Sequence, residues 1–554
     1  MNAAEAIVKV LEEENVKHIF GHPGEQILPF YSALNDSDIK HILTRHEQGA
    51  IHSADGYARG SGDFGVCVAT AGPGALNFTM GLAVSFKDSV PLLVITGDNP
   101  SSSCDKFQDI DIDSVFKPIV FKSFHPLDGK TSILNIKEAI DILKTEPKGP
   151  IHINLPKDVL LDEDIGIFDE CFNDFIDVEV NYSHDFDYSQ LNNLVSEIKK
   201  AKKPLILAGS GIFWGKAVSE FKQFVETNNI PYVHTYHAKS LLGDFPLDLG
   251  LVGIRGGKMA NYSFNNSDLI IIFGSRLSER SIATGGDFFK DNNGFIDFKS
   301  SATKVIHVNI EKEVLSGDVN IHGDLAYVLK ELNSLGKISD FDDSWLKEIH
   351  SYCEEYFIDD LVSENIPIKP QVAIDLILKR FKDNIIVNDA GSHTTWVNLL
   401  SEKYFNKLIF SGAMAPMGYG LPAACGASIA KPNEGIILIN GDGGFQMNIQ
   451  ELATVSTYNL PILIVVLNNS QLGIIRQWED QYYDNIRFEV DLENPDFVSI
   501  ASAYGIDGET VSSKEELELA IDNFKFNNSL KLDKPYLIEV LVEEEDIPVL
   551  PTNI

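Results

Sequence analysis

The chain has 554 residues, of which 44% are hydrophobic and 23% charged, the composition of a soluble globular protein. Its length exceeds what one ordinary core needs and predicts about three or four domains of roughly 100–200 residues each. The net charge of −36 gives a surface that repels nucleic acid and anionic membranes, so neither is expected as a main partner.

The first residues, MNAAEAIVKVLEEENVKHIFG, predict an amphipathic helix followed by a strand. They lack the basic start and apolar centre of a signal peptide, and no run of about 18 apolar residues is present in the chain. The five cysteines are scattered without a C-x-x-C pair, which argues against a disulfide framework and against a thiolate metal site. We therefore expect a cytoplasmic protein.

Short β-branched runs alternate with helical patterns through most of the chain. In the first block, strands are predicted at VKHIFG, GVCVATAGPG, VPLLVITGD and GPIHINLP, and the segments between them have helical spacing. This alternation is typical of a parallel sheet packed between helices. The block ends near LPKDVLLDED, and the acidic, aromatic residues 165–187 that follow predict a linker.

Two further blocks repeat the α/β pattern. The second runs from KPLILAGSGIFWG through SDLIIIFGSRL and TKVIHVNIEKE to IHGDLAYVLKEL, and a second linker-like stretch, GKISDFDDSWLKEIHSYCEEY, follows it. The third starts near IKPQVAIDLILKRF and contains NIIVNDAGSH, GIILINGDGGF, LPILIVVLNN and PYLIEVLVEEE. The sequence thus predicts an α/β protein with three doubly wound parallel-sheet domains, over residues 1–165, 188–338 and 360–554. The first and last blocks could share a fold, which the sequence indicates only weakly.

Two polar turns in the third block follow apolar runs that predict neighbouring strands. Asp442 stands in the turn GDGGF after IILIN, and Asn469 ends the run LPILIVVLNN. The segment QMNIQELATVSTYN between them predicts one crossover helix, so a right-handed β-α-β unit would bring both turns to one sheet edge. Carboxylate, amide and carbonyl oxygens suit Mg²⁺, and Gly443 and Gly444 would let the backbone approach a diphosphate. Each turn alone is more often structural, whereas the pair at this spacing is far more specific.

The stretch GDGGFQMNIQELATVSTYNLPILIVVLNN resembles the cofactor-binding motif of the thiamin-diphosphate-dependent enzymes. The resemblance implies that Asp442, Asn469 and the backbone carbonyl of Gln471 ligate Mg²⁺. Through that ion, and beside Gly441 of the same turn, the chain would hold the diphosphate of thiamin diphosphate.

The resemblance extends to the first block, where TRHEQGAIHSADGYAR is similar to the segment that sets a carboxylic acid against the pyrimidine ring of the cofactor. Glu47 would then protonate that ring; the alternative is a helix-starting glutamate that the helix dipole favours. The segment TAGPGALN would place Pro73 and Asn77 near the same ring. In this family the acid and the diphosphate site come from different chains, so a homodimer or homotetramer with active sites at the dimer interface is implied.

Two other segments of the third block resemble cofactor contacts. The first, SGAMAPMGYGLPAACGA, is similar to the segment that bends the cofactor: Met417 would lie between its two rings and the carbonyl of Ala415 would accept from its aminopyrimidine. Simple core packing is the alternative for Met417. The second, NDAGSH, resembles a segment that lines the diphosphate, through Gly391 and His393.

Over nearly the whole chain the resemblance is strongest to the acetolactate (acetohydroxyacid) synthases. The matching stretches are GHPGEQILPFYSAL, KFQDIDI, GPIHINLPKDV, GSRLSERSIATGG and NNSQLGIIRQWEDQYY. Arg280 would bind the carboxylate of a second 2-keto acid, with a structural ion pair as the alternative. Trp478 would face the alkyl group of that acceptor, with core or interface packing as the alternative. The residues implied at the substrate are Phe107, Gln108, Lys157, Arg280 and Trp478.

In those synthases the middle domain binds FAD, which plays no net redox part. The turns AGSG, VGIRGG, GSR, NIE and GD fall where the flavin contacts would be. A lone G-x-G turn is weak support, and other members of the family keep this domain without flavin. The residues implied are Gly209, Gly211, Gly253, Arg255, Gly274, Arg276, Asn309, Glu311, Gly323 and Asp324.

Some residues depart from the pattern of the synthases in places that bear on the substrate and partly on the flavin. Near the expected substrate entrance the family has small residues where this chain has a charged and an amide side chain. The departures are Glu25 and Gln26 there, the run Leu277-Ser278-Glu279-Arg280, the pair Ile254-Arg255, and Thr394 beside the diphosphate.

Several functions stay open on the sequence alone. The first is an acetolactate synthase that decarboxylates pyruvate and joins the two-carbon unit to pyruvate or 2-ketobutyrate, in branched-chain amino acid biosynthesis. The others are a 2-keto acid decarboxylase or other thiamin-dependent lyase, a flavin-dependent keto acid oxidase, and a non-catalytic relative, against which the intact Glu47, Asp442 and Asn469 argue. A small regulatory subunit is a further partner that this sequence cannot reveal.

Overall fold

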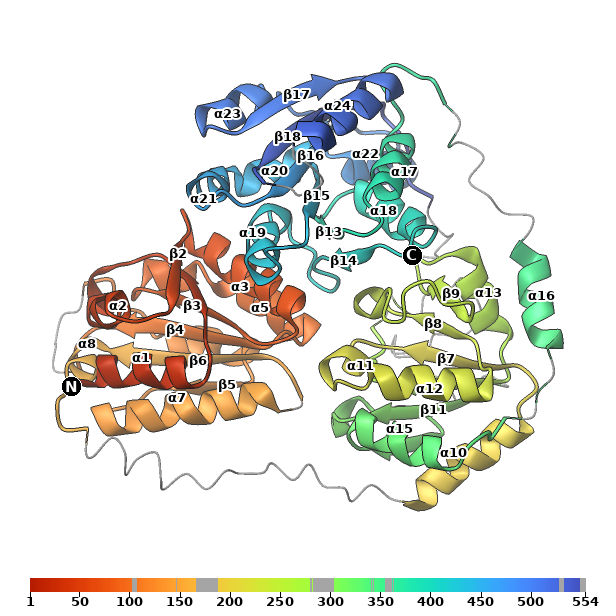
Figure 1. The fold of residues 1–554 in the computed structure, drawn as a ribbon, viewed down its shortest axis with the longest axis horizontal. Helices are drawn as coiled ribbons and strands as arrows, with labels where there is room; N and C mark the ends of the chain where they lie inside the picture. The colour runs from red at the N-terminus through yellow and green to blue at the C-terminus, as the bar shows by residue number, and fades with distance from the viewer. Residues whose placement is uncertain are drawn as a thin grey trace. The chain divides into compact units, whose positions relative to one another are not determined.

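The computed structural model describes the chain except residues 102–106, 146, 166–187, 279–280, 282–302, 340, 342, 354–360, 362, 528–532 and 549–554. Within the described residues the chain forms three six-stranded parallel sheets, one in each predicted block (Figure 1). The predicted α/β class with three doubly wound sheets is therefore confirmed. Most of the linker expected at 165–187 lies outside the described residues, and the domain boundaries stay predictions.

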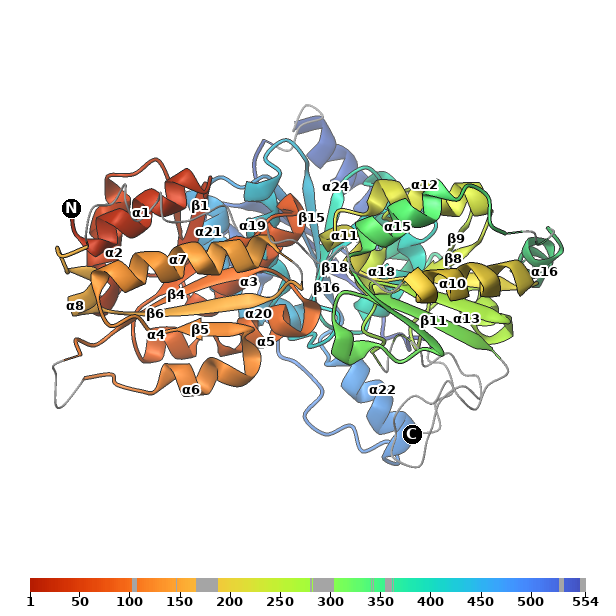
Figure 2. The same cartoon turned by 90° about the horizontal axis from the view of Figure 1, so that it is seen from below.

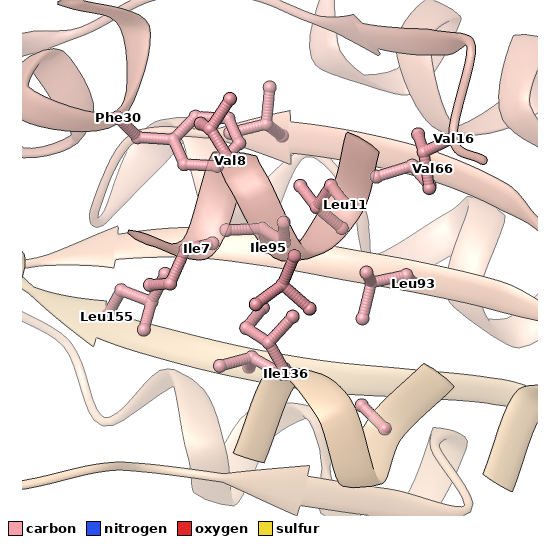
Figure 3. Packing of buried hydrophobic residues seen from close by; sticks show 14 of the residues in the cluster. Ile7, Val8, Leu11, Val16, Phe30, Val66, Leu93, Ile95, Ile136 and Leu155 are labelled. Atoms are coloured by element: carbon pink, nitrogen blue, oxygen red, sulfur yellow. The ribbon is translucent and has the colours of Figure 1, made fainter. Parts of the chain in front are cut away.

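The first sheet has the order β2-β1-β3-β4-β6-β5. Helices α1 and α7 pack side by side on one face, where Ile7, Leu11 and Ile136 meet Ile95 and Leu155 of the sheet (Figure 3). Its strands are β1 (His18–Gly21), β2 (Lys40–Leu43), β3 (Gly65–Ala69), β4 (Leu92–Asp98), β5 (Lys122–Phe124) and β6 (Pro150–Pro156). Its helices are α1 (Ala3–Glu13), α2 (Leu28–Asn35), α3 (Glu47–Ser61), α4 (Pro73–Leu76), α5 (Thr79–Asp88), α6 (Ile112–Phe116), α7 (Gly129–Lys144) and α8 (Lys157–Leu160).

The third sheet has the order β14-β13-β15-β16-β18-β17, which repeats the strand order of the first sheet position by position. The shared fold that the sequence indicated only weakly is thus present. Its strands are β13 (Ile385–Asn388), β14 (Lys407–Ile409), β15 (Ile436–Gly441), β16 (Ile462–Asn468), β17 (Asp507–Val511) and β18 (Tyr536–Leu541). The helices of this block are α17 (Pro370–Arg380), α18 (His393–Ser401), α19 (Gly420–Ala430), α20 (Asp442–Met447), α21 (Leu452–Thr457), α22 (Gly473–Tyr482), α23 (Phe497–Ala503) and α24 (Lys514–Asn527).

The central sheet has a different order, β12-β11-β10-β7-β8-β9, which is the order of dinucleotide-binding doubly wound sheets. One face packs on Phe221, Phe224 and Val328 of α12 and α15, and the other on Phe264 and Trp345 of α13 and α16. The strands are β7 (Pro204–Ala208), β8 (Tyr232–His234), β9 (Asp248–Leu251), β10 (Leu269–Phe273), β11 (Lys304–Asn309) and β12 (Val319–His322). The helices are α10 (Tyr188–Lys200), α11 (Gly211–Trp214), α12 (Val218–Asn228), α13 (Lys258–Asn266), α15 (Leu325–Ser334) and α16 (Ser344–Cys353).

The chain divides into two compact units. The first holds the first sheet and most of the third, and the second holds the central sheet together with α17 and α18. The first unit comprises Met1–Val180, Ile385–Gly391 and Ile409–Val542, and the second Asn181–Asn384, Ser392–Leu408 and Glu543–Ile554. In the described parts of both units, no helix is long and apolar enough to cross a membrane.

Inside the first unit, helix α3 of the first block lies directly against α19 of the third, and both helices lie between the two sheets (Figures 1 and 2). The two backbones are so close that a Cβ atom at Gly426 would overlap the carbonyl oxygen of Ser53. A Cβ atom at Gly56 would likewise overlap the carbonyl oxygen of Ala423. Small residues at these positions are therefore a condition for joining the two sheets into one unit.

We expect Gly426→Ala to destabilise the first unit by about 1–3 kcal/mol, because the added methyl group forces the α3 and α19 backbones apart. Gly257→Ala is the control, since a Cβ atom there meets nothing within 4 Å and its φ of −67° suits alanine. Urea denaturation followed by circular dichroism measures both changes. Equal stability of the Gly426 variant and the wild type would show that the helices do not pack this closely.

Candidate active site

The two predicted turns lie side by side at the carboxyl edge of the third sheet. Strands β15 and β16 pair in parallel with Gly441 opposite Leu467, so Asp442 and Asn469 follow adjacent strand ends. The crossover between them was expected to be one helix, and this is wrong. It consists of α20, a 3₁₀ turn (Ile449–Glu451) and α21, with a break at Asn448, whose side-chain amide donates to the carbonyl of Gly418 at 2.7 Å.

Asp442 is 3% exposed, and its carboxylate is held on both sides. The backbone N–H of Gly443 donates to Oδ1 at 2.9 Å, and the side-chain amide of Asn494 donates to Oδ2 at 2.7 Å. Burial raises the pKa of Asp442, and the hydrogen bond from Asn494 opposes that rise. Nothing in the sequence pattern singled out Asn494.

Several features of this edge fit a magnesium ion and a diphosphate. Among the described residues no three His, Cys, Asp or Glu side chains gather as a metal site, so a metal here would depend on Asp442 with amide and carbonyl oxygens. The side-chain oxygen of Gln471 and the side-chain amide of Asn388 are buried without a hydrogen-bond partner within the described part of the chain. Buried polar atoms of this kind are satisfied when a polar ligand binds. The ligand roles of Asp442, Asn469 and Gln471 stay predictions.

The segment 411–420 passes over this edge and contains the two residues predicted to bend the cofactor. The side-chain methyl of Met417 lies 3.1 Å from where a Cβ atom of Gly443 would be, so Met417 reaches across the GDG turn. Ala415 has a φ of +46°, in the left-handed region. Asp389, which follows β13, accepts from the backbone N–H groups of Gly418 at 3.1 Å and Gly420 at 3.0 Å. Burial raises the pKa of Asp389 to about 6.

A buried ionic cluster from the first block holds both ends of the same segment. Asp88 accepts from the backbone N–H groups of Gly412 at 3.1 Å and Ala413 at 3.0 Å, and Asp55 accepts from the Tyr419 hydroxyl at 2.6 Å. The Arg59 guanidinium bridges the two carboxylates, at 2.6 Å from Asp55 and 2.8 Å from Asp88. Sequence reasoning missed this cluster; the i, i+4 spacing of Asp55 and Arg59 in DGYAR was the available signal.

Glu47 begins helix α3, and the structure brings it together with Asn77 as expected. The Asn77 side-chain amide donates to Glu47 Oε2 at 2.8 Å, and Pro73 begins the short helix α4 of the same turn. Just before Glu47, the carboxylate of Glu451 accepts the backbone N–H of Arg45 at 3.0 Å. The start of α3 thus lies beside the crossover between Asp442 and Asn469 of the same chain. That the acid and the diphosphate site of one active site come from two different chains stays a prediction.

Of the substrate residues predicted in the first block, Gln108 lies against the Pro73 turn and Lys157 contacts Glu25. Gln108 has a φ of +60°, and its carbonyl packs so tightly on Gly72 that no Cβ atom fits there. Lys157 lies 3.5 Å from the carboxylate of Glu25, so the unexpected acid near the predicted entrance has a basic partner. An exposed pair of this kind contributes only about 0–1 kcal/mol to stability.

Arg280 and Trp478 are the two residues predicted to bind the second keto acid. Arg280 lies outside the described residues. Trp478 lies on α22 with 38% of its surface exposed, close in sequence to the exposed Ile475 and Tyr482. The proposed pairing of these two side chains around an acceptor stays a prediction, as do the contacts of Gly391 and of His393, which begins α18 in the second unit.

The predicted flavin residues share the carboxyl edge of the central sheet. Gly209 and Gly211 follow β7, and Gly274 follows the adjacent β10, where the strand order reverses and dinucleotides bind in such sheets. A Cβ atom at Gly211 would lie 2.8 Å from the Cα atom of Gly274, so the glycines also have a purely structural reason.

The other predicted flavin residues follow neighbouring strands of the same sheet. Glu311 follows β11, and burial raises its pKa while Arg276 opposes the rise. Asp324 follows β12 and caps α15 by accepting the N–H of Tyr327 at 3.1 Å. In the remaining loop, Gly253 is paired with Asn261, and Arg255 follows two residues later. The binding of FAD at this edge stays a prediction.

Comparison with protein families gives three matches in chain order. They are the thiamine pyrophosphate enzyme N-terminal TPP binding domain over residues 1–115, the central domain over 191–332 and the C-terminal TPP binding domain over 389–540. Each match falls on one of the three sheets.

Curated relatives match over the full chain. The probable acetolactate synthase large subunit of Methanocaldococcus jannaschii is 36% identical over 100% of this chain and 94% of that protein. The acetolactate synthase large subunit of Lactococcus lactis is 36% identical over 100% of this chain and 95% of that protein. The acetolactate synthase isozyme 2 large subunit of Escherichia coli is 32% identical over 100% and 98%. The chain therefore belongs to the acetolactate synthase large subunit family of thiamine pyrophosphate enzymes, and it is a thiamin-diphosphate-dependent enzyme of that type.

Proposed function

We propose that the protein decarboxylates pyruvate and joins the two-carbon unit to a second 2-keto acid, pyruvate or 2-ketobutyrate, in branched-chain amino acid biosynthesis. The observation that supports this most is the Asp442–Asn469 edge together with the Glu47–Asn77 pair in one compact unit. Full-length similarity to acetolactate synthase large subunits supports the choice of reaction.

The cofactor would be held mainly by the third block. Bound thiamin diphosphate supplies a carbanion that adds to the keto group and takes up the electron pair released with CO₂. Asp442, Asn469 and the carbonyl of Gln471 would hold Mg²⁺ against the diphosphate, with Gly443 and Gly444 leaving space for it. Met417, which reaches across the GDG turn, would support the bent cofactor.

Glu47 would move the proton that activates the cofactor. The Asn77 amide donates to one of its carboxylate oxygens at 2.8 Å, which leaves the other oxygen for the pyrimidine ring. A carboxylic acid at that ring nitrogen can donate and recover a proton, whereas an amide cannot.

The outcome of the reaction depends on what reaches the two-carbon unit after CO₂ has left. If a proton from water reaches it, acetaldehyde leaves; if a second keto acid is held there first, a carbon–carbon bond forms. Arg280 would bind the acceptor carboxylate with its planar fork, and Trp478 would pack on the acceptor alkyl group. Lys157 and Gln108 would line the approach from the first block.

Further partners are part of the same proposal. FAD would bind at the carboxyl edge of the central sheet, near Gly211, Gly274 and Asp324. Because the relatives are named large subunits, a small regulatory subunit would bind this chain. Two or four copies of the chain would form the enzyme, with active sites at the dimer interface.

With pyruvate, thiamin diphosphate and Mg²⁺, we expect acetolactate rather than acetaldehyde as the product, measured by chromatography. Arg280→Ala should shift the product towards acetaldehyde, because decarboxylation survives while the acceptor is lost. The wild type should favour 2-ketobutyrate over pyruvate as acceptor by roughly 10- to 200-fold, the value of one methylene in an apolar pocket, and Trp478→Leu should remove most of that preference.

Acetaldehyde as the sole product of the wild type would point to a decarboxylase, and oxygen uptake with pyruvate would point to a keto acid oxidase. Either result contradicts the proposed synthase and leaves the thiamin-dependent family assignment in place.

We expect Glu47→Gln to slow hydrogen–deuterium exchange at the thiazolium C2 by about 10²–10⁴-fold, since the amide cannot act as the acid. NMR of the bound cofactor measures this exchange without any substrate. Glu13→Gln, an acid-to-amide change at the exposed end of α1, is the control and should leave the exchange unchanged. Wild-type exchange in the Glu47 variant would remove this residue from the mechanism.

We expect the purified protein to contain FAD, released by heating and recognised by its absorbance and mass. We expect this because the predicted flavin contacts all lie at one edge of the central sheet. If the protein is colourless and calorimetry also shows no binding of added FAD, the flavin part of the proposal is wrong, whatever the reaction product.

A further inference from the structure

A chain of hydrogen bonds crosses the third sheet below the predicted metal site. Thr510 on β17 donates to Glu539 on β18 at 2.9 Å, and Asn468 at the end of β16 donates to the same carboxylate at 2.7 Å. Asn494 donates to Asn468 at 2.8 Å and to Asp442 at 2.7 Å. The chain therefore joins three strand ends and ends on the only carboxylate predicted to bind the metal.

Glu539 and the backbone N–H of Ser470 together set the direction of these bonds. As a carboxylate Glu539 can only accept, so Asn468 must turn its NH₂ group towards it. The oxygen of Asn468 then faces away and accepts from the backbone N–H of Ser470 at 3.0 Å and from Asn494. Glu539 is 5% exposed and Asn468 8% exposed, so water has little access to either group.

Asn494 connects Asn468 to Asp442 through its side-chain amide. Its NH₂ group donates to both Asn468 and Asp442, and its oxygen accepts from the side chain of Gln446 at 2.9 Å. With the amide reversed, its oxygen would face the Asp442 carboxylate, and two acceptors would meet. The amide orientation thus depends on partners at both of its ends.

The backbone places Asn494 beside the segment that contains Gln471. The N–H of Leu472 donates to the carbonyl of Val490 at 2.8 Å, and the N–H of Leu492 donates to the carbonyl of Ser470 at 2.8 Å. This short antiparallel pairing fixes the loop two residues before Asn494. The loop after β16 and the loop before α23 therefore form one structure next to Asp442.

We propose that Glu539 and Asn494 are positioning residues for the magnesium site, holding the Asp442 carboxylate in one direction and tying the GDG turn to the NN turn. The inference rests on the magnesium site of the proposed function. Neither residue is a predicted ligand; both act through Asp442. Loss of such outer partners typically lowers metal affinity by about 10–100-fold.

The test uses Glu539→Gln and Asn494→Ala in the full-length protein saturated with thiamin diphosphate. Glu539→Gln replaces one of the two carboxylate oxygens by an NH₂ group, so Asn468 and Thr510 no longer both donate to a negatively charged acceptor and the chain of bonds is weakened at its start. We expect the Kd for Mg²⁺, measured by calorimetric titration, to rise about 10–100-fold in both variants. Excess Mg²⁺ should restore kcat, and the melting temperature of the protein without Mg²⁺ and cofactor should stay near that of the wild type.

Glu509→Gln is the matched control, because Glu509 accepts from Tyr536 at 2.8 Å on the same two strands but lies outside this chain of bonds. Its Mg²⁺ affinity should equal that of the wild type. Unchanged affinity in both test variants overturns the inference. The inference is also overturned if the test variants melt at a lower temperature than the wild type without Mg²⁺ and excess Mg²⁺ does not offset this loss, since the residues would then be structural only. If the wild type itself does not bind Mg²⁺ with thiamin diphosphate, the proposed function fails instead.

Discussion

Parallel pairing brings the carboxyl ends of neighbouring strands to one edge of a sheet, and the candidate site depends on this constraint more than on any single contact. In the third sheet, Asp389, Asp442 and Asn469 directly follow β13, β15 and β16 respectively, which places three polar groups from distant parts of the sequence on one edge. The first sheet repeats the same strand order and ends β1 and β3 on the turns at Gly24 and Gly72. One topology used twice thus carries both sets of residues that are predicted to hold the cofactor.

Buried charge helps to join the first and third blocks of the chain within the first unit. Asp55, Arg59 and Asp88 are taken out of water where α3 meets the segment after β14, and isolated charges there would cost several kcal/mol each. The Tyr419 hydroxyl and two backbone N–H groups complete the hydrogen bonding of both carboxylates. The cluster therefore fixes both ends of the segment that contains Ala415 and Met417, while the close approach at Gly426 sets how near the two helices lie.

Sequence patterns predicted the inner strands of these sheets and missed the outer ones. In the first and third sheets the quoted apolar runs became β1, β3, β4, β6, β13, β15, β16 and β18, whereas β2, β5, β14 and β17 were not anticipated. All four missed strands lie at sheet edges and are only partly buried, so none of them forms a continuous apolar run. The prediction of a single helix between Asp442 and Asn469 was wrong for a different reason. The helix is interrupted at Asn448, whose side chain donates to the carbonyl of Gly418, thirty residues earlier in the chain.

The same distinction separates the site residues that could be predicted from those that could not. Asp442 and Asn469 could be predicted as site residues because each follows its own strand, which is a local signal. Asn494 and Glu539, the proposed positioning residues, could not, because their hydrogen bonds depend on which strands become neighbours, and they lie 52 and 71 residues from their partners. In the sequence, Glu25 was an unexpected negative charge near the predicted entrance. Its basic partner Lys157 is 132 residues away in the chain and is brought to it only by the fold.

The acidity of the chain is compatible with the proposed anionic substrate, because most of its negative charges lie too far from any one site to act on it. A net charge of −36 is spread over the whole surface, and at physiological ionic strength charges beyond about 8 Å are largely screened. A keto acid, the proposed substrate, would therefore meet only the local set of groups. At the predicted entrance that set includes Lys157 with Glu25 at 3.5 Å, a pair whose charges offset each other at short range. Attraction of the substrate carboxylate would then depend on another residue than this pair, which is the role proposed for Arg280.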